Sequence, residues 1–234
     1  MNDLDVAVEA SAAAAGVLRR LFGTNLPAHY KGPIDPVTAA DEAAEEALLA
    51  VIRRERPADS ILSEEGGGGT GTSDRSWVVD PMDGTVNFVN GIPHIAVSVG
   101  LWEGNSPLVG VIRDVLRDEV FTAVRGSGAF MNGGAIHVTD KTHMKRAVFA
   151  TGYPYDHREH AAAYGAVTSA VLQHVQGIRR FGSAALDLAW TAAGRYDGYF
   201  ELGVAPWDMA AGTLLVTEAG GVVTDPRGHA PTLA

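Results

Sequence analysis

Apolar residues recur every three or four positions along the N-terminal part of the chain. Val6, Ala10 and Val17 have this spacing, which predicts a helix from about Leu4 to Phe22 with one buried face. A polar loop is expected to follow, extending through Lys31.

A second helix is predicted to start at Thr38. Thr38 and Asp41 have the spacing of a capping box, an apolar stripe follows, and Pro57 ends the pattern. Asp41 can therefore serve simply as part of a helix cap.

Beyond Pro57 the pattern changes to short apolar or β-branched runs separated by Gly, Asn and Asp, which predict strands. These runs lie around Ile61, Trp77 to Val79, Ile95 to Leu101, Leu108 to Ile112, Val120 to Val124, and Ile136 to Val138. Asn132-Gly133-Gly134 predicts a hairpin turn.

Helical spacing returns at about 157–175 and 184–193, where Gly194 closes the second segment. A strand is expected over 196–202, a final helix from near Asp208 to Gly220, and a further strand at Val222-Val223. This order predicts layered sheets and helices of a mixed α/β architecture.

Composition limits the kinds of partner. The chain has 234 residues, 46% of them apolar, and a formal net charge of −10, which argues against a nucleic-acid or anionic-membrane surface. Cysteine is absent, so Asp, Glu and His are the only strong side-chain metal ligands. The acidic N-terminus is unlike a signal peptide and no stretch has the apolar length of a membrane span, so a cytoplasmic protein is expected.

The glycine-rich segment GGGGTGTS, residues 66–73, is predicted to be a flexible loop or linker. It lacks the lysine and helix start of a phosphate-binding P-loop.

Carboxylates follow a strand-like run or open a helix in three places. These are SILSEEGG with Glu64, WVVDPMDGTVNF with Asp80 and Asp83, and APWDMAAG with Asp208. Each has a simple structural interpretation as a solvated turn, an Asp-Pro and Asp-Gly turn, or a helix cap. Turn formation does not explain why an apolar run should lead directly into Asp80, because a buried carboxylate is costly unless it is paired or binds a metal.

If the three places meet, four negative charges lie close together, and two divalent ions would neutralise them. Oxygen ligands without His or Cys favour Mg²⁺, with Mn²⁺ as an alternative. The Met82 carbonyl is a further candidate ligand, and the amides of Gly84 and Thr85 could hold anionic oxygens. Such a site suits metal-assisted hydrolysis of a phosphate ester.

The two longest motifs resemble the signatures of the inositol monophosphatase family. They are WVVDPMDGTVNF, residues 77–88, and WDMAAGTLLVTEAGG, residues 207–221, with DPVTAAD at 35–41 and SEE at 63–65 in family order. The resemblance covers nearly the whole chain. It implies an αβαβα sandwich, usually a homodimer, and lithium-sensitive hydrolysis of small phosphate monoesters with two or three Mg²⁺ ions per site.

The resemblance also implies the metal ligands. Glu64, Asp80 and the Met82 carbonyl would bind the first ion, and Asp80, Asp83 and Asp208 would bind the second.

The remaining site residues are implied in the same way. Thr85 and Glu64 would orient the attacking water, Asp41 would hold the Thr85 hydroxyl, and the amides of Gly84 and Thr85 would contact phosphate. Asp83, Ala184 and Glu201 match the positions that contact the inositol ring, the alcohol part of the substrate, in similar proteins.

The family pattern implies one phosphatase unit over 1–234, with an α+β half at about 1–140 and an α/β half at about 141–234 forming one site. Two features depart from it. Lys31 matches a loop lysine of the family only loosely, and the chain stops at Ala234, so the usual C-terminal strand and helix are expected to be absent.

Glu201 makes inositol 1-phosphate the leading substrate. Fructose 1,6-bisphosphate, histidinol phosphate, nucleotide 3′-phosphates and NADP remain alternatives within the class. The alternative of another class is a family member that mainly binds a macromolecule.

Overall fold

The structure, a computed structural model, describes residues 1–24, 26–30 and 36–232. Lys31 and Asp35, the first residue of the DPVTAAD motif, lie outside the described residues.

Two antiparallel helices form the first layer, and both sequence predictions are confirmed. Helix α1 spans Asp3–Leu21 and α2 spans Ala39–Glu55, where Thr38 is the N-cap and Asp41 completes the capping box. Their apolar faces pack on the neighbouring sheet in one core cluster. The predicted loop between them contains a short antiparallel pair, β1 (Ala28–Tyr30) and β2 (Pro36–Thr38).

The second layer is a seven-stranded sheet in the order β3-β4-β5-β6-β7-β8-β9. Strand β3 is parallel to β4, and every later pair is antiparallel. The predicted turn is confirmed, because Asn132 and Gly133 have positive φ angles of 48° and 80° between β8 and β9. The strands are β3 Ser60–Ser63, β4 Arg75–Asp83, β5 Ala96–Glu103, β6 Ser106–Asp114, β7 Glu119–Val124, β8 Ala129–Met131 and β9 Gly134–Ile136.

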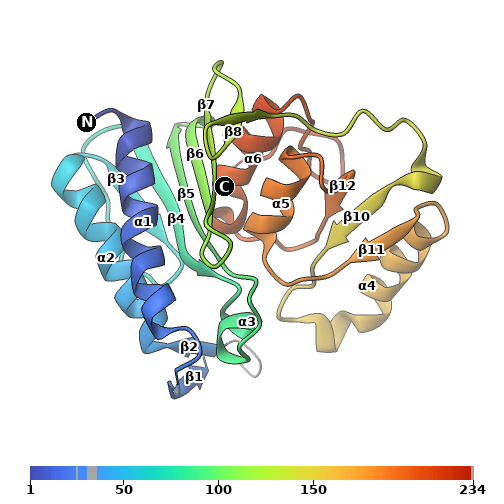
Figure 1. The fold of residues 1–234 in the computed structure, drawn as a ribbon, viewed down its shortest axis with the longest axis horizontal. Coiled ribbons are helices and arrows are strands. Elements are labelled where there is room, and N and C mark those ends of the chain that lie inside the picture. The colour runs from blue at the N-terminus through green and yellow to red at the C-terminus, as the bar shows by residue number, and fades with distance from the viewer. Residues whose placement is uncertain (25, 31–35, 233–234) are drawn as a thin grey trace.

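Helices α5 and α6 cover the other face of this sheet, and beyond them lie a three-stranded parallel sheet and α4 (Figure 1). The small sheet has the order β11-β10-β12, and the sequence analysis missed both β10 and β11. The elements are η1 Met144–Arg146, β10 Val148–Thr151, α4 His157–Leu172, β11 Gly177–Arg179, α5 Ala184–Ala192, β12 Gly198–Phe200 and α6 Pro206–Glu218.

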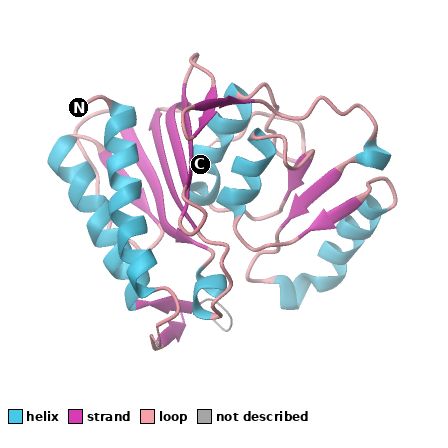
Figure 2. Cartoon of the chain, in the orientation of Figure 1, coloured by secondary structure: helices cyan, strands magenta, loops and turns pink. Residues whose placement is uncertain are grey.

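Figure 2 shows the alternation of helix and sheet layers that the αβαβα prediction requires, so the predicted fold class is confirmed.

The predicted strand at Val222-Val223 is wrong. That segment has no regular structure, and the Val222 side chain is 84% exposed, because no strand of the described chain pairs with it.

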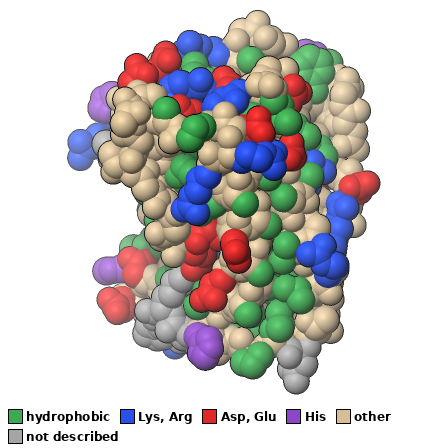
Figure 3. Space-filling view, turned by 90° about the vertical axis from the view of Figure 1, so that its left-hand side faces the viewer, with side chains coloured by type: hydrophobic (Ala, Val, Ile, Leu, Met, Phe, Trp, Pro, Cys, Tyr) green, Lys and Arg blue, Asp and Glu red, His purple; other side chains and the backbone are tan. Residues whose placement is uncertain are grey.

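The face formed by α1 and α2 carries Arg side chains interspersed with Asp and Glu (Figure 3). Some of these charges are paired across the two helices, such as Arg54 with Glu9 at 2.7 Å.

Candidate metal centre and active site

The first carboxylates of the site come from the end of β4. Asp80 is 1% exposed and Asp83 is 8% exposed, at the edge of a strand whose Trp77 is fully buried. The pairing of β4 with β5 shifts register between Asp80 and Asp83, at Pro81. A register shift of this kind re-aims side chains, and here it lets both aspartates serve one place.

Asp208 reaches the same place from α6. Helix α6 packs closely on the sheet because β5 and β6 present glycines to it: a Cβ at Gly100 or Gly110 would collide with Ala210 or Ala211. Carboxylate oxygens of Asp80, Asp83 and Asp208 consequently lie within 4.8 Å of one another.

Burial raises the pKa of all three carboxylates. Burial raises the pKa of Asp80 well above its usual range, and Glu64, Asp83 and Asp208 raise it further. Burial also raises the pKa of Asp208, with Asp83 and Glu64 adding to the effect. For Asp83, burial raises the pKa to about 6 despite the Ser183 hydroxyl, which lowers it. An all-oxygen donor set with unmet negative charge fits a hard divalent cation such as Mg²⁺.

Asp83 connects the first sheet to α5. Its Oδ2 accepts hydrogen bonds from the Ser183 hydroxyl at 2.6 Å and from the Ala185 amide at 2.7 Å. Ala184, the first residue of α5, also offers its backbone to Asp83. The bonds from Ser183 and Ala185 fix Oδ2 of Asp83.

Thr85 lies between Asp41 and Met82. Its hydroxyl is 3.0 Å from Asp41 Oδ1 and 3.2 Å from the Met82 carbonyl oxygen. Asp41 Oδ2 accepts from the Thr38 amide and hydroxyl, so the same carboxylate caps α2 and holds Thr85. The cap and the contact with Thr85 are therefore compatible.

Gly84 precedes Thr85 with a φ of 99°, a conformation that favours glycine. A Cβ there would lie 3.0 Å from the His94 carbonyl oxygen. Glycine therefore permits the tight turn that brings β4 into α3 (Thr85–Val89).

Glu64 follows β3, and its charge acts on Asp80 and Asp208, although it is outside the group within 4.8 Å. Glu45 of α2 fixes the loop that carries it: Glu45 Oε1 accepts from the Ser63 hydroxyl at 2.5 Å and from the Gly67 amide at 3.1 Å. The loop prediction for 66–73 is confirmed, but Gly69 pairs with Ile61 and folds the segment back onto β3.

Glu201 follows β12 and faces the same cluster of charges. Burial raises its pKa, and the Tyr199 hydroxyl, which donates to its Oε2 at 2.6 Å, lowers it. Asp83 and Arg180 also act on the Glu201 charge, with opposite signs.

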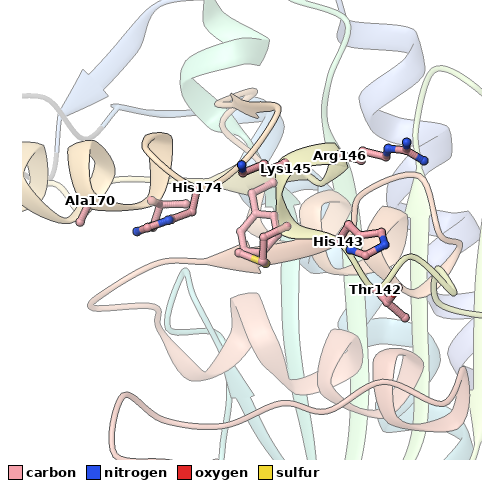
Figure 4. A pocket seen from close by; sticks show the side chains of 9 residues that line it. Thr142, His143, Lys145, Arg146, Ala170 and His174 are labelled. Carbon is pink, nitrogen blue, oxygen red and sulfur yellow. The ribbon is translucent and has the colours of Figure 1, made fainter.

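An open pocket of about 940 Å³ lies between η1 and α4 (Figure 4). Its floor is apolar, with Met144, Phe149 and Val171, and none of the carboxylates described above lines it. No Asp or Glu of the described chain lines this pocket, so the candidate metal centre is the carboxylate cluster.

His94 is 3% exposed. Burial and Arg117 lower its pKa to about 4, so it is neutral at pH 7. It packs against Phe181 and Trp190, which is a core environment.

Sequence reasoning missed three residues that hold the site together: Glu45, Ser183 and Tyr199. Ser183 had a signal, because a serine before AALDLAW is a good helix N-cap. Glu45 and Tyr199 had none, since their partners depend on contacts between separate elements.

Comparison with known proteins agrees with this geometry. Residues 2–234 match the inositol monophosphatase family profile. The chain belongs to the inositol monophosphatase family.

Individual relatives carry two kinds of name. The chain is 42% identical over 225 residues to Nus factor SuhB of Escherichia coli, covering 95% of this chain and 84% of the relative. It is 43% identical over 228 residues to inositol-1-monophosphatase of Mesorhizobium japonicum, covering 96% of this chain and 86% of that relative. The crystal structure of extragenic suppressor protein suhB from Bartonella henselae superposes with a TM-score of 0.90 at 42% identity, covering 96% of this chain and 88% of that one.

No helix within the described residues combines the length and apolar character needed to cross a bilayer.

Proposed function

We propose that this chain is a Mg²⁺-dependent phosphate monoester hydrolase that acts on inositol 1-phosphate. The observation that carries the proposal is the convergence of Asp80, Asp83 and Asp208, three carboxylates with oxygens within 4.8 Å, beside the Thr85–Asp41 pair.

The proposed metal ligands are the three aspartates, Glu64 and the Met82 carbonyl. Mg²⁺ bound there would supply positive charge to the phosphate oxygens and lower the pKa of bound water. The chain's own residues would do the rest, by holding phosphate and by orienting water.

Thr85 and Glu64 are proposed to orient the attacking water. When the Thr85 hydroxyl donates its single hydrogen to Asp41 Oδ1, its oxygen lone pairs are free to accept a hydrogen bond from water. The Glu64 carboxylate would accept a hydrogen bond from the same water, and the amides of Gly84 and Thr85 would contact phosphate.

The substrate assignment depends on the alcohol side of the site. Asp83, Ala184 and Glu201 are the proposed contacts of the inositol ring, and the Glu201 carboxylate suits a ligand with free hydroxyl groups. Fructose 1,6-bisphosphate, histidinol phosphate, nucleotide 3′-phosphates and NADP are the alternatives.

The test is phosphate release from inositol 1-phosphate, fructose 1,6-bisphosphate, histidinol phosphate and adenosine 3′,5′-bisphosphate, each with Mg²⁺ and with EDTA. Mg²⁺-dependent release led by inositol 1-phosphate is expected. Another leading substrate would overturn the substrate assignment, and no release from any compound would overturn the hydrolase.

The relatives named Nus factor SuhB support a second candidate function, in which the chain contacts another macromolecule and catalysis is secondary. An Asp80→Asn variant separates the two. Under the second function it loses phosphate release but keeps its biological role in a complementation assay, whereas under the first it loses both.

Lithium inhibition and a homodimer also remain predictions from the resemblance, and a cytoplasmic location remains a prediction from the acidic N-terminus and the apolar pattern of the sequence. Inhibition kinetics, light scattering and cell fractionation test them in turn.

A further inference from the structure

The Glu201 carboxylate is held from one side by a tyrosine of the strand that leads to it. Tyr199 Oη donates to Glu201 Oε2 at 2.6 Å, the length of a charge-assisted bond. The other oxygen, Oε1, accepts no hydrogen bond from any residue that the structure describes. One oxygen is thus occupied while the other can receive a hydroxyl group.

Two parallel strands fix where this pair lies. Tyr199 of β12 is in register with Ala150 of β10, and the Thr151 hydroxyl donates to the Phe200 carbonyl at 2.8 Å. Gly152 follows β10 and Glu201 follows β12, so these two residues lie side by side where the paired strands end.

Gly152 gives the carboxylate its space. A Cβ at this position would overlap both oxygens and Cδ of Glu201, so any larger residue would push the carboxylate aside. The Glu201 carboxylate is consequently bonded to the Tyr199 hydroxyl on one side and faces the bare backbone of Gly152 on the other.

We propose that Tyr199 is a positioning residue for Glu201, which it orients so that Oε1 accepts a hydroxyl of a polyol phosphate. Gly152 provides the room for this orientation. The inference rests on the proposed function, in which Glu201 contacts the alcohol part of the substrate. Tyr199 would then favour substrates whose alcohol carries further hydroxyl groups.

The tyrosine ring and its hydroxyl have separable roles. The ring packs against the core cluster formed by α5 and α6, and phenylalanine would preserve that contact. The hydroxyl contacts Glu201. Tyr199→Phe therefore tests positioning without removing the packing.

The experiment compares kcat and KM for inositol 1-phosphate and for p-nitrophenyl phosphate, which has no hydroxyl for Glu201 to meet. Tyr199→Phe is expected to lower kcat/KM for inositol 1-phosphate roughly tenfold, mainly through KM, because a bond to a charged group is lost. The kcat/KM for p-nitrophenyl phosphate should change less than about twofold, as expected for a substitution that touches no group used by this substrate. Tyr164→Phe is the matched control, since it removes a tyrosine hydroxyl on α4 that donates to the exposed Asp156, the N-cap of that helix. It should change kcat/KM for neither substrate.

A double-mutant cycle shows whether Tyr199 acts through Glu201. In a Glu201→Gln background, Tyr199→Phe should have little further effect on selectivity. Additive losses in the double variant, or equal losses on both substrates in the single variant, would overturn the proposal.

Gly152→Ala provides an independent perturbation and should give the same selectivity loss. Gly165→Ala on α4 is its control, since a Cβ there meets nothing within 4 Å. A crystal structure of Tyr199→Phe should show the Glu201 carboxylate reoriented. A Glu201 carboxylate that keeps its orientation in this variant would overturn the positioning role, whether or not the wild type is active. An inactive wild type would overturn the proposed function but not the positioning role.

Discussion

Replacing Ser183 with alanine tests whether the link between α5 and Asp83 supports the metal site. Ser183 is 1% exposed, and its hydroxyl donates to Asp83 Oδ2 at 2.6 Å and accepts from the Leu186 amide at 3.2 Å. The first bond has a charged acceptor and contributes about 1.5–3 kcal/mol. The second caps α5 and contributes about 1 kcal/mol. Ser183→Ala should therefore lower the free energy of unfolding by roughly 2.5–4 kcal/mol, because the two losses combine.

The variant should also weaken Mg²⁺ binding. The Ser183 hydroxyl lowers the pKa of Asp83, so removing it raises that pKa and leaves more of the carboxyl protonated. Protons then compete with the metal, and the Mg²⁺ concentration at half-maximal activity should rise roughly three- to tenfold at pH 6.5. The rise should be smaller at pH 8.5, where Asp83 is ionised in both proteins.

Urea unfolding in EDTA at pH 7.5 measures the stability term, and phosphate release over a Mg²⁺ titration measures the metal term. Ser98→Ala is the matched control, because it deletes a fully buried hydroxyl whose acceptor is the neutral Trp207 carbonyl, at 3.1 Å. It should cost about 0.5–1.5 kcal/mol and leave the Mg²⁺ response unchanged. Identical behaviour of the two variants would refute the reasoning.

Three further predictions follow from the charges of the site. Glu201→Gln should weaken turnover of inositol 1-phosphate much more than turnover of p-nitrophenyl phosphate; equal losses in steady-state kinetics would remove Glu201 from the specificity argument. Glu45→Ala should raise the Mg²⁺ requirement for phosphate release, because it frees the loop that carries Glu64, and an unchanged Mg²⁺ titration would contradict this. In EDTA the protein should lose stability as pH rises from about 4 to about 6, because burial raises the pKa of Asp83 from 3.8 to about 6 and the folded state binds more protons than the unfolded one. Thermal unfolding should show that Mg²⁺ reverses this loss, and stability in EDTA that increases over this range would contradict the account.

The sequence predicted elements whose pattern is local. Helix α1 has a regular apolar stripe, α2 has Thr38 and Asp41 as its cap, and the hairpin before β9 has Asn132-Gly133. These signals suffice because each element carries its own boundary residues.

The elements that the sequence analysis missed depend on distant partners. Strand β11 is Gly177–Arg179, three residues without alternation, and it exists because it pairs with β10. The converse error occurred at Val222-Val223, where two β-branched residues favour a strand but the described chain supplies no neighbour.

The candidate site divides in the same way. Asp80, Asp83 and Asp208 lie in motifs that point to chemistry, and the structure brings them together. The supporting contacts of Glu45 and Tyr199 could not be predicted, because each connects side chains through tertiary packing or a strand end.

Phosphate release from inositol 1-phosphate over a Mg²⁺ titration, in the wild type and in Asp80→Asn, tests the central claim most directly. Asp80 is a buried carboxylate at the centre of the proposed metal ligands, and its loss removes a ligand charge from them. We expect the wild-type rate to rise with Mg²⁺ and vanish in EDTA, and the Asp80→Asn rate to be lower by about three orders of magnitude or more. Similar rates in the two proteins, or wild-type release that persists in EDTA, would contradict a metal-dependent hydrolase built on these carboxylates.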